Sequence, residues 1–229
     1  MPRLVQPEIL DALPPSDPRA LRCRRDLCRV NFWMANHSLM ARALDEHWPD
    51  ATRQIAEIGA GDGQFLLGLA RRLKRRNVNA MMLDRHNLVS TKTLAAFSEV
   101  EWRAETAAAD VFDWMRAGGG ADIIIANLFI HQFEDAALKQ LFQAVSRRAL
   151  LFVALEPHRF YFPAPCAQML RLVGCGADTR HDAALSIRAG FLREELSALW
   201  PERAGWQLTE RRAGWFSHLF IAKKFKPGG

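Results

Sequence analysis

Short apolar runs alternate with amphipathic segments from Gln54 to the end of the chain. In the amphipathic segments apolar residues recur every three or four positions, whereas an isoleucine-rich run such as Asp122–Ala126 is typical of a strand buried in a parallel sheet. Strands are predicted at 54–58, 80–83, 100–104, 122–126, 150–155, 206–212 and 217–223. Helices are predicted at 64–72, 90–97, 135–146 and 191–199. This order predicts an α/β fold that ends in a two-stranded hairpin.

The first 50 residues follow a different pattern. Prolines predict a loose arm over residues 1–17, and Asp17-Pro18 is a favourable helix start. A helical stretch is predicted from about Arg19 to His47, with a break near Asn36. Its aromatic residues and methionines suit a helix laid over a pocket, and plain core packing explains them equally well. We therefore expect residues 1–50 to form a helical cap on a main body at 51–229.

The stretch from Gln54 to Leu73 organises the main body. A short strand ends on Glu57-Ile58, the turn Gly59-Ala60-Gly61-Asp62-Gly63 follows, and a helix begins at Gln64. Glycines at alternate positions let the chain turn sharply, and they leave bare backbone where a Cβ would collide with a ligand. The helix start adds free N–H groups that suit an anionic group. The turn is therefore predicted to bind a small molecule.

The spacing of this turn narrows the choice of ligand. It reads G-x-G-x-G, not the G-x-G-x-x-G of a dinucleotide turn, and no G-x-x-x-x-G-K-[ST] triphosphate loop occurs in the chain. Asp84 ends the next predicted strand, roughly twenty positions after the turn, where a ribose-binding carboxylate is expected. A surface role for Asp84 is the simpler alternative, and the spacing favours ribose.

Residues Glu57 to Gly63 resemble the E/D-x-G-x-G-x-G signature of class I S-adenosylmethionine-dependent methyltransferases. The resemblance covers roughly residues 50–225. It implies a Rossmann-like fold with a seven-stranded, mostly parallel sheet and an antiparallel final hairpin. It also implies S-adenosyl-L-methionine as cofactor, with the methionine carboxylate near the helix start. The product would be S-adenosyl-L-homocysteine.

The resemblance assigns further positions. An acidic residue after the third strand would accept from the adenine amino group, and Asp110 matches it with Val111 beside it; Asp113 competes for this assignment. Cofactor and acceptor would meet after the fourth strand, at Asn127-Leu128. The expected cofactor-binding residues are Glu57, Gly59, Ala60, Gly61, Gly63, Asp84, Arg85, Asp110, Val111, Asn127 and Leu128.

An insertion at about 157–189 follows the fifth strand and fits neither a strand nor one long helix. It holds Phe160-Tyr161-Phe162 and later Arg180-His181-Asp182. In this fold such insertions commonly build the acceptor pocket.

A narrower resemblance rests on Arg24–Leu27 with Asn31, Thr179–Ala183, Ser186–Phe191 and the ending Ala213–Phe220. These segments look like small bacterial methyltransferases of aromatic polyketide and aryl-polyene pathways, that is, of secondary metabolism. That resemblance implies a phenolic or lipid-like aromatic acceptor, free or attached to a carrier protein.

Two histidines are candidate bases. A phenol acceptor has a pKa near about 10 and benefits from a base, and histidine titrates in the useful range. His131 follows the fourth strand, and His181 lies beside Arg180 and Asp182. Each has a plainer alternative, because His131 could cap the helix near Glu134 and His181 could order a loop. No metal triad assembles from these positions, so no metal is expected.

Composition sets the remaining limits. The chain has 229 residues, a length that suits one domain with a sizeable core. Its formal net charge is +6. No apolar run reaches the about 20 residues that a membrane span needs, and no signal peptide is visible, so a cytoplasmic location is expected. Four scattered cysteines, at positions 23, 28, 166 and 175, are interpreted as free thiols.

The positive charge leaves other functions open. The densest basic cluster, Arg71–Arg76, lies at the end of the first helix of the main body, where cations complement the helix dipole. This interpretation is favoured over a nucleic-acid patch. The sequence Asn127-Leu128-Phe129 also lacks the prolines of base-methylating enzymes, which makes nucleic acid an unfavoured partner. An RNA or protein methyltransferase, or a cofactor-binding partner protein without catalysis, remains an alternative.

Overall fold

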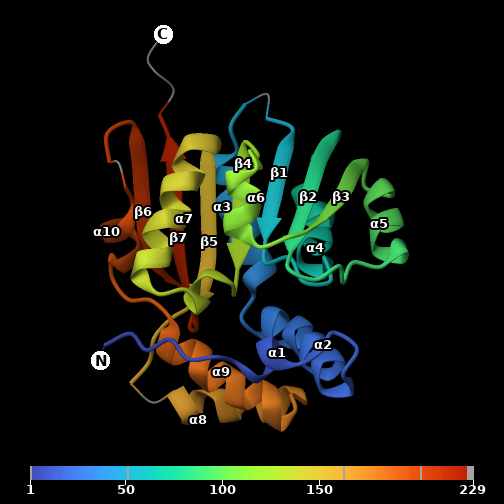
Figure 1. Ribbon diagram of the computed structural model, residues 1–229, viewed down its shortest axis with the longest axis vertical. Helices are drawn as coiled ribbons and strands as arrows, with labels where there is room; N and C mark the ends of the chain where they lie inside the picture. Colours follow the sequence, from blue (N-terminus) through green and yellow to red (C-terminus); the bar gives the residue numbers. More distant parts are fainter. Residues whose placement is uncertain (1, 51, 162, 202, 226–229) are drawn as a thin grey trace.

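The computed structural model describes residues 2–50, 52–161, 163–201 and 203–225, and Figure 1 shows their arrangement. The strands are β1 Gln54–Ile58, β2 Val78–Asp84, β3 Trp102–Ala108, β4 Ile123–Asn127, β5 Leu151–Pro157, β6 Trp206–Ala213 and β7 Ser217–Lys224. The helices are α1 Ile9–Ala12, α2 Pro18–Trp33, α3 Asn36–His47, α4 Gln64–Leu73, α5 Thr91–Ser98, α6 Val111–Arg116, α7 Asp135–Arg148, α8 Pro163–Gln168, α9 Ala177–Ala189 and α10 Glu195–Leu199. Two 3-10 helices are η1 Ile130–Gln132 and η2 Met169–Val173.

The strands form one seven-stranded sheet in the order β3-β2-β1-β4-β5-β7-β6. Strands β1 to β5 run parallel, and β7 lies antiparallel between β5 and β6. The predicted Rossmann-like sheet with its closing hairpin is confirmed. The strand order reverses between β2-β1 and β4-β5, so the carboxyl ends of β1 and β4 flank the topological switch point, where α/β sheets bind ligands.

Apolar residues on both faces of the sheet produce three layers. Residues of α3, α4 and α5 form one buried cluster with alternate positions of the strands, including Ile123, Ile125 and Val153. The intervening positions, such as Ile124 and Phe152, pack against α6, α7 and α10 on the other face. Every residue of β4 is buried, because both of its faces are covered by helices.

Two predicted boundaries were wrong. The third strand begins at Trp102 rather than Val100, because the chain first turns through Glu101, whose φ is +58°. The last crossover helix spans only Glu195–Leu199 of the expected 191–199, and Phe191 instead forms an isolated bridge with His158.

A helical lobe covers the carboxyl ends of the parallel strands. It contains α1, α2, α8 and α9, which lie together below the sheet in Figure 1. The interpretation that His181 orders a loop is wrong, since Arg180-His181-Asp182 lies inside the helix α9. The expected loose arm is also wrong, because residues 3–10 are held against α9 and η1 by hydrogen bonds. Phe162, one of the expected pocket aromatics, lies outside the described residues.

Three buried asparagines fasten the N-terminal helices to the sheet. Asn36 Nδ2 donates to Asn31 Oδ1 at 2.9 Å and to Asn127 Oδ1 at 3.0 Å. Asn127 Nδ2 donates to Asn31 Oδ1 at 2.9 Å, and Ser217 Oγ donates to Asn36 Oδ1 at the same distance. Because these groups are buried, any partner left without its hydrogen bond would pay a desolvation cost. This network therefore sets the position of α2 and α3 over β4.

We expect Asn36→Ala to lower the free energy of unfolding by about 1–3 kcal/mol, because the Asn127 oxygen and the Ser217 hydroxyl lose their partner and the Asn31 oxygen loses one of its two donors. Urea unfolding followed by circular dichroism measures the change. Asn87→Ala is the matched control, because Asn87 is exposed in a loop. Equal unfolding energies for the two variants would contradict the role of the network.

Candidate functional site

The glycine turn after β1 has the backbone geometry that the sequence predicts. Gly59, Gly61 and Gly63 all have positive φ, at +72°, +56° and +75°. A Cβ on Gly59 would lie 2.2 Å from the Phe129 ring, and one on Gly63 would lie 2.5 Å from Met82 Sδ. At Gly61 no atom lies within 4 Å of the added Cβ. The first and third glycines thus allow close packing, and the second faces open space.

Two adjoining cavities flank this turn. The Glu57 cavity contains Glu57, Ala60, Asp62 and Gln64, and the Asp84 cavity contains Asp84, Asp110, Val111 and Phe133. Their walls share Arg24, Leu27, Gly59, Gly61 and Leu128. Together they form a crevice that runs along the bare backbone of the turn, which we call the turn crevice.

Glu57 lies at the bottom of the Glu57 cavity. Its side chain is buried, with 2% of the residue exposed, and Oε2 has no hydrogen-bond partner among the described residues. Burial, assisted by the nearby charge of Asp62, raises the pKa of Glu57 well above its usual range. A buried carboxylate without a partner is costly, so the position suits a cationic or hydrogen-bond-donating ligand group.

Asp84 closes the other end of the turn. Its Oδ2 accepts from the Gly61 N–H at 2.9 Å, and its Oδ1 accepts from the His86 N–H at 3.0 Å. The carboxylate is partly buried and lines the Asp84 cavity. Because each carboxylate oxygen has a second lone pair, Asp84 can still accept from two ligand hydroxyls.

Asp110 and Val111 stand opposite Asp84 in the same cavity. Asp110 caps α6 by accepting from the Phe112 N–H at 2.8 Å, and its other oxygen pairs with Arg85 at 3.1 Å. Burial opposes the charge of Asp110, but these two partners outweigh it and lower its pKa. The structure therefore brings Arg85, Asp110 and Val111 to one wall of the crevice.

A third, mostly apolar cavity opens beside the turn crevice. It holds about 880 Å³ of space, including the part open to solvent. Its apolar walls come from α2, the region 157–187 and the β6–β7 hairpin, and they include Val30, Trp33, Met34, Pro157, Phe160, Leu170, Ile187 and Phe216. Its polar lining comprises Glu8, Cys23, His131, Gln132, Cys166, Thr179, Asp182 and Ser186. We call it the apolar cavity.

Leu27 and Leu128 stand at the junction of the three cavities, since both line all of them. Leu128 has a φ of +52°, and its N–H donates to the Leu155 carbonyl at 2.9 Å. A left-handed backbone is uncommon for leucine and is kept only where the surroundings fix it. The chain is therefore bent just after β4, where the turn crevice meets the apolar cavity.

Asn127 has a structural role that the sequence did not reveal. Its side-chain amide belongs to the buried asparagine network, although the residue also lines the Glu57 cavity. Its oxygen and its NH₂ group are thus each engaged within the protein.

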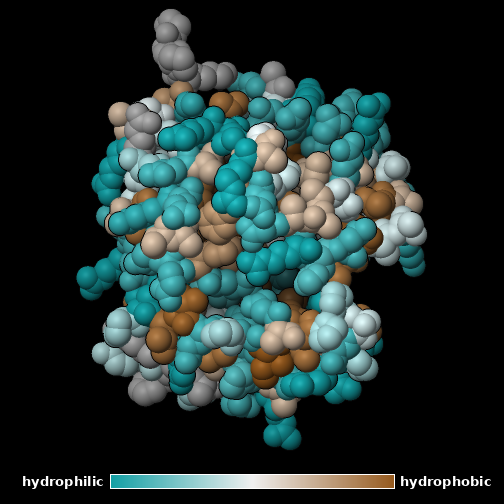
Figure 2. All heavy atoms as spheres, in the orientation of Figure 1, coloured by the Kyte–Doolittle hydropathy of each residue, from teal (hydrophilic) through white to brown (hydrophobic). Residues whose placement is uncertain are grey.

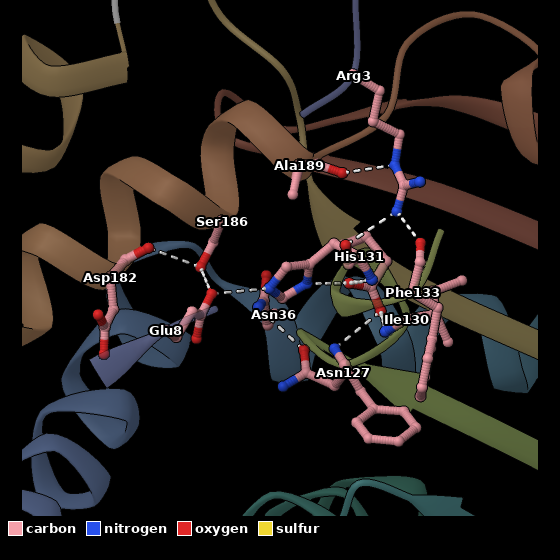
Figure 3. A network of polar contacts seen from close by, with 12 residues as sticks. Arg3, Glu8, Asn36, Asn127, Ile130, His131, Phe133, Asp182, Ser186 and Ala189 are labelled. Atoms are coloured by element: carbon pink, nitrogen blue, oxygen red, sulfur yellow. Dashed lines mark hydrogen bonds and ion pairs between the residues drawn. The ribbon is translucent and has the colours of Figure 1, made fainter. Parts of the chain in front are cut away.

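His131 lies on η1 and is buried, with 2% of its surface exposed. Its Nδ1 is 2.7 Å from Glu156 Oε2, and its Nε2 is 3.3 Å from Glu8 Oε1 (Figure 3). Burial alone would lower the pKa of His131, but the hydrogen bonds and charges of Glu156 and Glu8 raise it to about 10. The side chain is therefore an imidazolium at neutral pH, and both of its nitrogens act as donors.

His181 does not reach the cavities. It is exposed on α9, whereas Thr179, Asp182, Ala183 and Ser186 on the opposite face of that helix line the apolar cavity. The prediction that His181 contacts the acceptor is thus not supported, because the helical register turns its side chain away. Within the described residues, no group of three or more His, Cys, Asp or Glu could hold a metal ion.

Sequence reasoning missed two charged residues of this region. Arg24 lines both halves of the turn crevice, and Glu8 lines the apolar cavity and contacts His131. Both come from the first 50 residues, where Arg24 contributed only to the resemblance to bacterial methyltransferases and was given no binding role. The helical spacing of Arg24 and Leu27, three residues apart, could have indicated that they share a face.

No protein-family model matches this chain, and no curated protein matches it in sequence. Solved structures do match. The plantazolicin methyltransferase BamL, in complex with a triazolic desmethylPZN analog and SAH, superposes with a TM-score of 0.62 at 12% identity over 93% of this chain and 92% of that one. An O-methyltransferase family protein from Burkholderia thailandensis gives 0.54 at 17% identity over 85% of this chain and 60% of that one.

The pyocyanin biosynthetic protein PhzM gives a TM-score of 0.58 at 17% identity, over 94% of this chain and 60% of that one. The chain thus spans less than two thirds of the Burkholderia protein and of PhzM. The fold is the one these proteins share.

The raised pKa of His131 makes stability depend on pH. A group whose folded pKa exceeds its unfolded value contributes stability that is complete below the unfolded pKa, about 6.5, and that is lost as the pH rises through the folded pKa. We therefore expect the difference in unfolding free energy between wild type and His131→Gln to shrink as the pH rises from 6.5 to about 10. Urea unfolding at several pH values measures it, and a constant difference would contradict the ion-pair geometry.

Proposed function

We propose that this protein is an S-adenosylmethionine-dependent methyltransferase that methylates an oxygen of a small, hydrophobic aromatic or lipid-like acceptor. The observation that carries the proposal is the turn crevice. It leaves open space beside Gly61, has Glu57 at one end and Asp84 at the other, and meets an apolar cavity at Leu27 and Leu128.

The amino-acid end of the cofactor fits the Glu57 cavity. Its ammonium group would supply the partner that Glu57 Oε2 lacks, and Arg24 offers a guanidinium for the carboxylate. Arg24 is only partly buried, and one of its nitrogens donates to the Pro15 carbonyl at 2.7 Å. The other guanidinium donors remain for a ligand. An acidic and a basic side chain in the lining of one cavity match a zwitterion.

The nucleoside fits the Asp84 cavity. Asp84 would accept from the ribose hydroxyls while its two bonds to backbone N–H groups hold it in place. Asp110 and Val111 are adjacent in sequence, so one would accept from the adenine amino group while the other covers the ring. The remaining expected residues, Gly59, Ala60, Gly63, Arg85, Asn127 and Leu128, would shape or border the same crevice.

The cofactor supplies a methyl group on a positively charged sulfur. The protein then has to align the acceptor with that carbon and exclude water, which is worth about 7–11 kcal/mol in favourable cases. Leu27 and Leu128 line all three cavities, so they would surround the methyl group with apolar side chains where cofactor and acceptor meet. The left-handed backbone of Leu128 fixes the position of its side chain there.

The apolar cavity supports a small acceptor. Aromatic and aliphatic side chains form much of its wall, and such apolar walls with a few polar groups are typical of small-molecule sites. Trp33 stacks on Phe216 with ring centroids 4.2 Å apart. Phe160 packs edge-on against the same Phe216 ring, with centroids 5.9 Å apart. These rings suit a flat phenolic acceptor, free or carried on a protein. Pathways of secondary metabolism, including aryl polyenes, make such compounds.

A nucleic-acid or protein acceptor is less well supported. The basic cluster at the end of α4 forms surface ion pairs, with Arg71 near Glu99, Arg75 near Asp45 and Arg76 near Glu101. Because these arginines already have partners, the cluster offers little free charge to a phosphate backbone. A binding protein without catalysis remains the alternative if the cofactor binds and no acceptor turns over.

No helix in the described part of the chain has the length and hydropathy to span a membrane. We propose a cytoplasmic location, where the cofactor is made and used.

We expect Gly61→Asp to weaken binding of S-adenosylhomocysteine by at least about tenfold, because the new side chain would enter the crevice and add negative charge. Isothermal titration calorimetry measures the affinity. Gly118→Asp is the matched control: its φ is +93°, open space also surrounds its Cβ position, and it lies outside the three cavities. Equal losses in both variants would mean that strain, not the crevice, is responsible.

Glu57→Gln tests the amino-acid end separately. A charge-assisted hydrogen bond is worth about 1.5–3 kcal/mol, so we expect the affinity for S-adenosylhomocysteine to fall roughly 10- to 100-fold. The affinity for 5′-methylthioadenosine, which lacks the amino-acid part, should not change. The free protein should not lose stability, because burial already favours the neutral form of Glu57, and glutamine is likewise neutral. An unchanged affinity for both ligands would refute the assignment of Glu57.

A further inference from the structure

The N-terminal arm forms one side of the apolar cavity and is fastened at two points. Arg3 donates to the carbonyls of Ala189, His131 and Phe133 and pairs with Asp135 at 3.0 Å. Figure 3 shows its guanidinium between α9 and η1. Five residues further on, Glu8 enters the cavity wall.

The second fastening is at Asp182 on α9. Its two carboxylate oxygens accept from the Ile9 and Leu10 N–H groups at 2.8 and 3.0 Å. These bonds fix the backbone immediately after Glu8. Glu8 is therefore held from both sides, and the direction of its side chain is set by the fold.

Glu8 presents one free carboxylate oxygen to the cavity. Its Oε1 accepts from Ser186 Oγ and lies 3.3 Å from His131 Nε2. Within the described residues, the structure gives Oε2 no hydrogen-bond donor. The side chain is 12% exposed, and it lines the apolar cavity. The Glu8 side chain is thus accessible from the cavity.

The neighbouring groups cannot take a proton from an acceptor as readily. His131 holds protons on both nitrogens at neutral pH, because it lies between Glu8 and Glu156. Glu156 is fully buried and accepts from the N–H groups of Phe129, Ile130 and His131 as well as from the imidazole. Each oxygen of Asp182 already accepts from a backbone N–H, which leaves it only its second lone pairs. Glu8 Oε2 is the carboxylate oxygen of this cluster that has no donor among the described residues.

We propose that Glu8, rather than His131, is the base that takes the proton of the methyl acceptor. This inference rests on the proposed function. The acceptor O–H donates to Glu8 Oε2, and the acceptor oxygen forms a bond to the methyl carbon. The bond from that carbon to the sulfonium sulfur breaks, and its electron pair stays on sulfur. The acceptor proton passes to Glu8, which becomes a neutral carboxylic acid.

His131 has a different task in this arrangement. Its imidazolium holds Glu8 in place, and because His131 also lines the apolar cavity, its positive charge lies near an acceptor bound there. A cation in this position favours the phenolate-like charge that develops during transfer. His131 is thus a positioning residue, held in turn by Glu156.

The first test uses substituted phenols of graded acidity with labelled S-adenosylmethionine. For weakly acidic phenols, which need a base, we expect Glu8→Gln to lower kcat by about a hundredfold or more. For 4-nitrophenol, which is largely ionised at pH 8, the loss should be less than about tenfold. Added formate should restore part of the activity of Glu8→Ala. Glu46→Gln, an exposed pair with Arg42 on α3, is the matched control and should behave as wild type.

Two outcomes of this test would overturn the proposal. One is wild-type activity of Glu8→Gln on weakly acidic phenols. The other is an equal loss on all phenols, which would indicate that Glu8 only supports the fold. Calorimetry with S-adenosylhomocysteine distinguishes a failure of the Glu8 proposal from a failure of the proposed function. Both wild type and Glu8→Gln should bind this ligand, because Glu8 lies outside the turn crevice. If wild type does not bind the cofactor, the proposed function itself fails.

The second test needs no substrate. Nitrogen-15 NMR of the histidine rings reports which nitrogens carry protons, and His131→Gln identifies the signal among the seven histidines. In wild type at pH 8 we expect His131 to be doubly protonated, and Glu8→Gln should lower its pKa. If His131 titrates near its ordinary value, its free nitrogen could serve as the base, and the proposal for Glu8 would be wrong.

Discussion

A buried carboxyl group with one unpaired oxygen, at the end of strand β1, is the constraint on which the rest of the site depends. Glu57 lies at the floor of the crevice with Oε2 unsatisfied. Burial raises its pKa and disfavours the charged form, which a cationic partner would stabilise. The three-layer packing around β1 and β4 holds it there, and the glycine turn keeps side chains out of the adjoining space. The fold thus keeps Glu57 in an environment that disfavours its charged form, and the ammonium group of a zwitterionic ligand would supply the missing partner.

The segments outside the sheet complete the site. Residues 1–50 supply Arg24 and Leu27 to the crevice and Glu8 to the apolar cavity, and the region 157–187 supplies much of the opposite wall. The buried asparagines hold α2 and α3 on the sheet, and the contacts of Arg3 and Asp182 hold the arm. Figure 2 shows hydrophobic residues, in brown, beside hydrophilic residues, in teal, on the surface of this lobe.

The sequence predicted the sheet, the turn and the position of Asp84 at the end of β2, because periodicity and glycine spacing are local signals that packing reinforces. It could not predict the arm, whose contacts join Arg3 to residues 128 to 186 positions away. It misread α9, since that helix buries Thr179 and Asp182 and lacks a clear apolar stripe. It identified His131 but not its charge, which depends on Glu8 and Glu156 from distant segments. Single side-chain contacts of this kind leave no pattern along the chain.

The most direct test of the account is a crystal structure of the protein with S-adenosylhomocysteine. We predict that the ligand lies along Gly59–Gly61, with its ammonium within hydrogen-bond distance of Glu57, its carboxylate near Arg24 and its ribose on Asp84. Electron density for the ligand elsewhere, with the crevice beside Gly61 filled by side chains, would contradict the account.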